Sequence, residues 1–117
     1  MTTLYAIYGA SGCGRSLMPV ARQQLARQGD ASEIIFIDDA LTDIASVNGH
    51  RAMNYQAFLN EFASTKYVQI AIANSRVREK IAQRLEADGI QLWSITADHV
   101  VLMDQIELAK GSALSPF

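Results

Sequence analysis

Short apolar runs alternate along the chain with longer amphipathic segments. Four runs, at residues 4–8, 33–37, 67–72 and 90–95, are largely apolar and are predicted to form strands. The continuous apolar run in the second of them is typical of a strand covered on both faces, as in a parallel sheet. Because segments with helical spacing lie between them, the pattern predicts an α/β fold, a Rossmann-like parallel sheet with right-handed crossovers and helices on both faces.

Three intervening segments repeat their apolar residues every three or four positions, which predicts helices. The predicted inward faces are Leu17, Val20, Ala21 and Leu25; Tyr55, Phe58, Leu59 and Phe62; and Val77, Ile81 and Leu85. Asn54 and Asn74 directly precede the second and third segments, where a side-chain oxygen caps a helix by accepting a hydrogen bond from a free N–H group. Residues 40–53 show no clear period, although Asn48-Gly49 is a turn pair.

A glycine-rich turn joins the first strand to the first helix. It reads GASGCGRS at residues 9–16, with glycines at its first, fourth and sixth positions. A helix N-terminus offers unpaired N–H groups and a partial positive charge, and glycines let the backbone approach an anion. We therefore interpret it as a phosphate-binding turn of the Rossmann type, but not a dinucleotide fingerprint, because Ser11 stands where the second glycine is required. The alternative is that Gly9 and Gly14 only permit a tight connection.

Polar residues follow the second and third predicted strands. Asp38 and Asp39 end the second strand, and Asn74 follows the third. The carboxyl ends of parallel strands border the crevice in which such sheets bind ligands. One of the two acids is expected to contact a base or a ribose, the alternative being a pair of solvated turn residues. Asn74 is a candidate ligand contact or simply a helix cap.

The composition indicates which kinds of partner the protein can bind and in which compartment it is expected. The 117 residues carry a net charge of −2 and have a pI near 5.6, which argues against a nucleic-acid partner, because broad binding to nucleic acids needs a basic face. Cys13 is the only cysteine, so an internal disulfide is impossible and a reducing cytoplasm is expected. We predict neither a signal peptide nor a membrane span. Cys13, His50 and His99 lack the partners of a nucleophile or a metal site, so no metal is expected.

The C-terminal residues follow a different period. Leu102, Leu108 and Leu114 lie six residues apart, which is typical of a hexapeptide left-handed β-helix and of neither a helix nor an alternating strand. The sequence thus predicts a Rossmann-like domain at residues 1–97 and the first rung or rungs of a β-helix at residues 98–117. Because the chain ends within the repeat, we expect a truncated protein.

In this order the motifs resemble those of bacterial nucleotide-sugar acetyltransferases, a family that includes sialic-acid O-acetyltransferases and bacillosamine-type N-acetyltransferases. The family's glycine turn is matched at residues 9–15, its acidic pair at residues 38–39 and its Asn-Gly at residues 48–49. Its Ile-Gly-Asp/Asn-Asn with a following arginine is matched in part by residues 72–75 and Arg78. The resemblance covers nearly the whole chain.

The resemblance implies a role for each candidate residue. Backbone N–H groups of the turn would hold the diphosphate of a nucleotide-sugar, Arg15 would add a charge-assisted bond to phosphate, and an acid would accept the imide N–H of uracil or thymine. The implied substrate-binding residues are Gly9, Ala10, Ser11, Gly12, Cys13, Gly14, Arg15, Asp38, Asp39 and Asn74.

Three positions depart from the family pattern. Cys13 stands where many members have histidine, Ala73 where they have glycine, and Thr96-Ala97 where they have His-Pro. The fold assignment does not depend on these residues, but the details of substrate recognition do.

The resemblance also implies an activity. Family members transfer an acetyl group from acetyl-CoA to a sugar amine or hydroxyl in surface polysaccharide or glycan biosynthesis, with a β-helix histidine as general base. That histidine would lie beyond Phe117. The chain alone is therefore expected to bind a UDP- or TDP-sugar, to hold no acetyl-CoA, to be inactive, and to be a monomer or weak dimer. The full-length protein would form a homotrimer through the β-helix. The sugar, N- versus O-acylation, and uracil versus thymine stay open.

Two other function classes remain. An NAD(P)-binding oxidoreductase domain would share the fold, but Ser11 interrupts its fingerprint, and the sequence shows no catalytic tyrosine–lysine or histidine arrangement. A non-catalytic module that senses a nucleotide or coenzyme A is the third class. Titration with UDP, TDP, NADH and CoA distinguishes the three.

Overall fold

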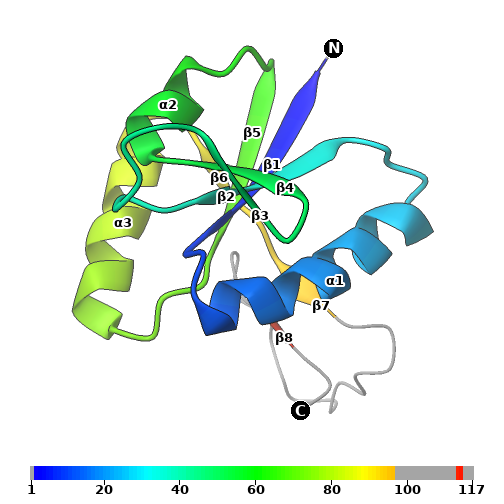
Figure 1. Cartoon of the computed structure of the whole chain (residues 1–117), viewed down its shortest axis with the longest axis horizontal. Helices are drawn as coiled ribbons and strands as arrows, with labels where there is room; N and C mark the ends of the chain where they lie inside the picture. Colours follow the sequence, from blue (N-terminus) through cyan, green and yellow to red (C-terminus); the bar gives the residue numbers. More distant parts are fainter. Residues whose placement is uncertain (1, 97–112, 115–117) are drawn as a thin grey trace.

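The computed structural model describes residues 2–96 and 113–114, and Figure 1 shows its elements. In chain order these are β1 (Thr3–Tyr8), α1 (Gly12–Arg27), β2 (Glu33–Ile37), β3 (Ala45–Val47), β4 (His50–Met53), α2 (Tyr55–Asn60), β5 (Thr65–Ile70), α3 (Ser75–Ala87), β6 (Gln91–Leu92), β7 (Ile95–Thr96) and β8 (Ala113–Leu114). This order confirms the predicted alternation of strands and helices.

Six strands form the main sheet, in the order β3-β4-β2-β1-β5-β6. Strands β4, β2, β1, β5 and β6 run parallel, and β3 is antiparallel to β4. The predicted parallel, Rossmann-like sheet is thus confirmed. The strand order reverses at β1, because the chain first adds β2 and β4 on one side of it and then β5 and β6 on the other. In open α/β sheets such a reversal marks the crevice where ligands bind, outside the carboxyl ends of the strands.

Two features of the strands differ from the pattern-based prediction. Residues 90–95 do not form one strand, because β6 joins the main sheet whereas β7 pairs with β8. Between them Trp93 donates its backbone N–H to the Val68 carbonyl, and its ring packs against the Tyr5 ring at a tilt of 46°, with centroids 4.5 Å apart. Residues 45–53, which show no hydrophobic period, form the β3–β4 hairpin around a turn at Asn48-Gly49, where φ is 51° and 83°.

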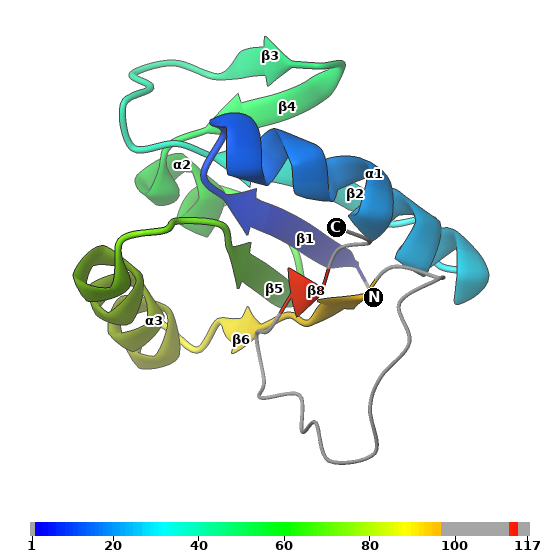
Figure 2. The same cartoon turned by 90° about the horizontal axis from the view of Figure 1, so that it is seen from below.

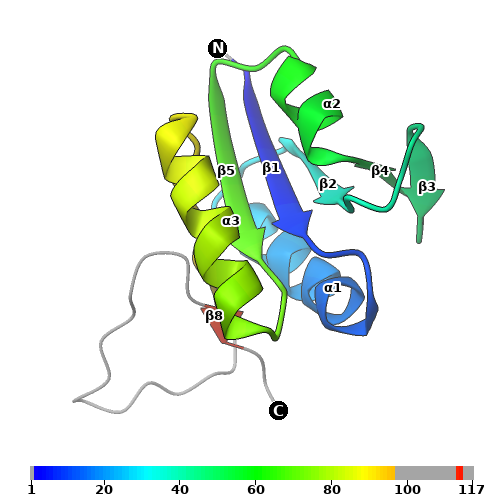
Figure 3. The same cartoon turned by 90° about the vertical axis from the view of Figure 1, so that its left-hand side faces the viewer.

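Helices cover both faces of the sheet, as predicted (Figures 2 and 3). Helices α2 and α3 lie over one face, where Tyr8, Phe58 and Leu85 belong to one buried cluster. Helix α1 covers the other face, where Ile7 and Phe36 belong to a second cluster. Because successive side chains of a strand point to opposite faces, neighbours in β1 enter different clusters. Burial on both faces explains why the strands read as continuous apolar runs.

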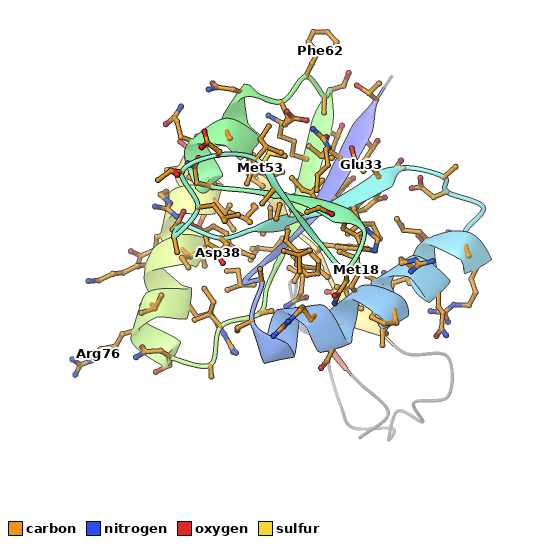
Figure 4. All side chains as sticks on the ribbon, viewed as in Figure 1. Met18, Glu33, Asp38, Met53, Phe62 and Arg76 are labelled. Atoms are coloured by element: carbon orange, nitrogen blue, oxygen red, sulfur yellow. The ribbon has the colours of Figure 1, made fainter. Side chains whose placement is uncertain are left out.

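Two residues predicted to point inward are exposed. Phe62 is 97% exposed, because α2 ends at Asn60 and the extended backbone of Glu61 leads the chain away from the sheet (Figure 4). Val77 is 42% exposed, although Ile81 of the same predicted stripe is buried. Figure 1 shows that α3 begins beyond the end of β5, so its first turn has less of the sheet to pack against.

The predicted helix caps are confirmed. Asn54 Oδ1 accepts a hydrogen bond from the Ala57 N–H at 2.9 Å. Asn74 Oδ1 accepts hydrogen bonds from the N–H groups of Arg76 and Val77, at 3.0 and 3.1 Å. Both caps pair N–H groups that have no partner within the helix.

The pair β7–β8 lies outside the main sheet. Ile95 is opposite Ala113 and Thr96 is opposite Leu114, so paired residues are 18 apart (113 − 95 = 18). Gln24 of α1 donates a side-chain hydrogen bond to the Ser94 carbonyl at 2.8 Å, which joins the start of β7 to α1. The predicted repeat positions Leu102 and Leu108 lie outside the described residues. The division between residues 97 and 98 therefore stays a prediction.

The glycine turn is held by two very close backbone contacts. A Cβ atom on Gly14 would lie 1.6 Å from the Gly9 carbonyl oxygen. Gly9 has a φ of 125°, and a Cβ atom there would lie 2.7 Å from the Ala71 carbonyl oxygen. By contrast, a Cβ atom on Gly12 would meet no atom within 4 Å. Gly9 and Gly14 are therefore required by the packing of the turn itself, whereas Gly12 is not.

We expect Gly14→Ala to lower the free energy of unfolding by roughly 1–3 kcal/mol or more, as overpacking does in a filled site. The matched variant Gly12→Ala should leave it unchanged or raise it by up to about 1 kcal/mol, because alanine favours the helix. Urea unfolding of the two variants measures the difference. Equal stability would contradict the close approach of α1 to the Gly9 carbonyl.

Candidate functional site

Three connections meet where the strand order reverses, at the carboxyl ends of β2, β1 and β5. Backbone hydrogen bonds tie these strand ends together. The Gly9 N–H donates to the Ile37 carbonyl at 2.8 Å, and the Ala71 N–H donates to the Tyr8 carbonyl at 2.9 Å. The glycine turn, the acidic pair and Asn74, all predicted from the sequence, therefore lie along one edge of the sheet.

The first turn of α1 presents N–H groups to this edge. Ser11 is the N-cap residue and has extended backbone angles, but its side chain makes no capping hydrogen bond, unlike Asn54 and Asn74. The first helical bond runs from the Arg15 N–H to the Ser11 carbonyl at 2.9 Å. The N–H groups of the three residues before Arg15 precede that bond and have no acceptor within the helix. Because Gly12 is exposed and its Cα is open to solvent, a ligand can approach this turn closely.

The start of α3 adds a second helix N-terminus to the same edge. Here the Asn74 oxygen is already used by the cap, and Arg78 Nε donates to the Ile72 carbonyl at 3.1 Å. Neither α1 nor α3 has an acidic residue in its first turn. Instead these turns carry Arg15, Arg76 and Arg78, and Figure 4 shows Arg76 pointing away from the body of the protein. Positive side chains beside the positive ends of two helices favour an anionic ligand.

Asp38 lies where β2 leaves the sheet (Figure 4). Its backbone N–H donates to the Met53 carbonyl at 2.9 Å, so the β2–β4 ladder continues through it. Its Oδ1 accepts a hydrogen bond from the Ala40 N–H at 3.0 Å, which closes a turn after the strand. Within the described part of the chain this is the single hydrogen bond made by its side chain, so the half-buried carboxylate keeps acceptor capacity for a ligand.

Asp39 is held by other side chains. It accepts a hydrogen bond from the Tyr8 hydroxyl, its Oδ1 lies 3.3 Å from the Tyr55 backbone N–H, and its Oδ2 lies 3.6 Å from Arg84 Nη2. Asp39 therefore contacts β1, the start of α2 and α3, although its side chain is 54% exposed.

Asp39 and four other residues form what we call the Tyr8–Arg84 cluster: Tyr8, Asp39, Tyr55, Arg84 and Asp88. The Arg84 guanidinium donates to the Tyr8 hydroxyl and stacks on the Tyr55 ring, 4.2 Å from its centroid. The Tyr55 hydroxyl donates to Asp88 Oδ2 at 2.5 Å. Burial, and next the bond to Asp39, raise the pKa of Tyr8, so the hydroxyl stays protonated and can donate to the carboxylate.

The sequence alone does not indicate this cluster. Tyr8 lies in the first apolar run, and Arg84 lies in the third segment with helical spacing, outside its apolar stripe. The two residues are separated by 76 positions, and no motif connects them. The available signal was the period of β1, which places Tyr8 on the same face of the sheet as α3.

The sequence offers three candidates for a nucleophile or a metal ligand: Cys13, His50 and His99. Cys13 is exposed and forms no disulfide. His50 lies in β4, and its ring packs edge-on against the Phe36 ring, with the two ring centroids 6.1 Å apart. His99 lies outside the described residues. Among the residues that the structure describes, no group of three potential metal ligands is found, and no helix is both long and apolar enough to cross a bilayer.

A groove of about 760 Å³ lies elsewhere on the molecule. It follows α1 from Pro19 to Ala26 and is bordered by the start of β2 and by the β3–β4 turn. Arg51 on its border is already paired with Glu33 and Glu61, at 2.7 and 2.6 Å. The groove contains none of the residues of the glycine turn or the acidic pair, so we do not assign the site to it.

The sequence is similar to those of known proteins. The sequence profile of the PglD N-terminal domain matches residues 5–85. A GDP-perosamine N-acetyltransferase of Escherichia coli O157:H7 is 30% identical over 115 residues, which is 97% of this chain and 52% of that protein.

Two solved structures are also similar. WeeI from Acinetobacter baumannii AYE has a TM-score of 0.87 and 39% identity, over 97% of this chain and 52% of its own. The acetyltransferase domain of PglB from Neisseria gonorrhoeae FA1090, in complex with acetyl coenzyme A, has a TM-score of 0.72 and 25% identity, over 97% and 53%. The chain thus spans about half the length of the relatives it matches.

The Tyr8 hydroxyl predicts how stability depends on alkaline pH. A tyrosine whose pKa is raised above its ordinary value of 10.0 in the folded state contributes its full stabilisation below pH 10 and loses it as the pH rises toward the folded value. The free energy of unfolding should therefore fall above about pH 10, and Tyr8→Phe should reduce that fall. Urea unfolding at several pH values between about 9 and 11 measures it. Parallel curves for the two proteins would contradict the role of the hydroxyl.

Proposed function

This chain belongs to the PglD N-terminal domain family, and from that premise we propose that it binds the nucleotide-sugar substrate of a sugar acetyltransferase. The whole protein would transfer an acetyl group from acetyl-CoA to an amine or hydroxyl of the sugar, in the cytoplasm, during the synthesis of a surface glycan. The observation that carries the proposal is the uncapped start of α1 at the reversal of strand order, where Gly12 leaves the backbone open.

The diphosphate of the ligand would lie against the glycine turn. The N–H groups of residues 11–14 would supply donors, the helix would supply partial positive charge, and the exposed Arg15 side chain would supply a cation. Gly9, Ala10 and Gly14 belong to the backbone of the turn, and Cys13 is exposed beside the N–H groups that would bind the diphosphate. Asn74 would act mainly through its cap, which fixes the start of α3 at the edge of the same crevice.

The base would be read by the acidic pair, with Asp38 as the contact. A carboxylate accepts one hydrogen bond from the imide of uracil or thymine, or two from the donor edge of guanine. We propose that the ligand is a UDP- or TDP-sugar, because the motifs resemble those of nucleotide-sugar acetyltransferases. GDP belongs among the test ligands, because one relative is named for GDP-perosamine.

The acetyl donor is proposed for the whole protein. The PglB domain was solved with acetyl coenzyme A, which supports this co-substrate. In the reaction the sugar nitrogen or oxygen would attack the thioester carbonyl, the bond to sulfur would break, and a general base would take the proton. We assign no described residue to that base.

The C-terminal residues are proposed to begin the second domain. The 18-residue offset between β7 and β8 equals three hexapeptides, which is one turn of a three-sided β-helix. This supports a boundary near residue 97, and trimerisation of the whole protein through the β-helix is part of the proposal. An NAD(P)-dependent oxidoreductase is the weaker reading, since the relatives are acetyltransferases and Ser11 replaces the central glycine of the fingerprint.

A substitution at Gly12 tests the diphosphate site without altering the packing of the turn. We expect Gly12→Val to weaken binding of UDP, TDP or GDP at least tenfold, or roughly 1.4 kcal/mol, because the new side chain occupies the approach to the N–H groups. The control Ala26→Val adds the same side chain to an exposed position late in α1 and should bind like the parent. Calorimetric titration, with NADH and CoA as further ligands, measures these affinities. Unchanged nucleotide binding by Gly12→Val would exclude this site.

A second substitution separates base recognition from phosphate binding. Asp38→Ala should weaken the preferred nucleoside diphosphate by about 1.5–3 kcal/mol, the value of a hydrogen bond to a charged group, and leave inorganic pyrophosphate binding nearly unchanged. Asp43→Ala removes an exposed acid from the same connection and serves as the control. If Asp38→Ala and the parent bind the nucleotide equally, Asp38 does not read the base.

A further inference from the structure

The two adjacent acids that follow β2 point to opposite faces of the sheet. Within β2, Ile35 and Ile37 belong to the cluster under α2 and α3, whereas Ile34 and Phe36 belong to the cluster under α1. Because the ladder continues to Asp38 through its bond to the Met53 carbonyl, the alternation carries its side chain to the α1 face. That face holds the glycine turn.

Asp39 goes to the other face, where α3 holds it. The Arg84 side chain is 45% exposed and the Asp39 side chain is 54% exposed. An ion pair that is this exposed to solvent adds little to the stability of the fold by itself. Here, however, the Tyr8 hydroxyl bonds to both partners, and Tyr8 is only 2% exposed. The guanidinium is also fixed by the Tyr55 ring beneath it. The contact is therefore a network with a buried centre, not an isolated surface pair.

We propose that Arg84 is a positioning residue for nucleotide recognition: by holding Asp39 on the α3 face, it fixes the connection after β2 so that Asp38 faces the ligand. This inference rests on the proposed function and extends it to a helix that does not itself contact the base. The mechanical link is short. Asp38 Oδ1 accepts a hydrogen bond from the Ala40 N–H, and the Asp38 carbonyl accepts one from the Leu41 N–H, so the residues on both sides of Asp39 belong to one hydrogen-bonded turn.

The proposal predicts a split between base recognition and phosphate binding. The glycine turn is set by its own contacts, the close packing of Gly14 on Gly9 and the start of α1, and it does not involve Arg84. Loss of Arg84 should therefore loosen the orientation of Asp38 and leave the N–H groups of α1 in place. A residue that only stabilised the fold would weaken both kinds of binding together.

The test compares Arg84→Met, which keeps the aliphatic stem, with Arg84→Lys, which keeps the charge. Each is titrated with inorganic pyrophosphate and with whichever of UDP, TDP and GDP the parent binds best. Arg84→Met should weaken the nucleotide at least fivefold and pyrophosphate less than twofold, and Arg84→Lys should recover part of the loss. Lys80→Met, an exposed position one turn earlier on α3, is the control and should match the parent.

A measurement without ligand tests the same link. Amide hydrogen exchange at Ala40 and Leu41 should be faster in Arg84→Met than in the parent, because both N–H groups bond to Asp38. Unchanged exchange, unchanged nucleotide affinity, or equal losses for nucleotide and pyrophosphate would each overturn the role of Arg84. Failure of the parent to bind any nucleotide would instead refute the proposed function, whatever the exchange rates show.

Discussion

The close packing of α1 on the end of β1 is the constraint from which the site follows. The backbone of Gly14 approaches the Gly9 carbonyl so closely that no side chain fits between them. That contact directs the N-terminus of α1 toward the carboxyl edge of the sheet and toward the reversal of strand order. The free N–H groups, the helix dipole and the open Cα of Gly12 then face the same place. Phosphate recognition by this chain would thus depend on backbone geometry more than on any one side chain.

The division of the sheet into two faces separates the tasks of neighbouring residues. Alternation along β1 sends Ile7 under α1 and Tyr8 toward α3, and alternation after β2 separates Asp38 from Asp39 in the same way. Asp38 makes one described side-chain hydrogen bond and keeps acceptor capacity, whereas Asp39 is bound into a network of two tyrosines and an arginine. A pair of carboxylates that reads as a single motif in the sequence therefore has two physical roles.

Membership of the PglD N-terminal domain family fits this arrangement, and the relatives whose names describe an activity are acetyltransferases. A domain with free helical N–H groups, several arginines and an oriented carboxylate is suited to binding an anionic nucleotide. The chain spans about half of the length of the relatives it matches.

The sequence by itself determined the features that depend on local order. Apolar runs and helical spacing predicted the parallel sheet, glycine spacing predicted the strand–turn–helix connection, and Asn54 and Asn74 predicted the caps, because each rests on neighbours within a few positions. Tertiary structure decided the rest. Phe62 and Val77 fit an apolar period yet are exposed, because a helix buries only the part of its stripe that has a sheet beneath it. Glycines that look alike in the sequence differ, since contacts with Ala71 and Gly9 constrain two of them and leave Gly12 free. The role of Asp39 required Tyr8 and Arg84, which come from distant elements and meet only when α3 packs on the sheet.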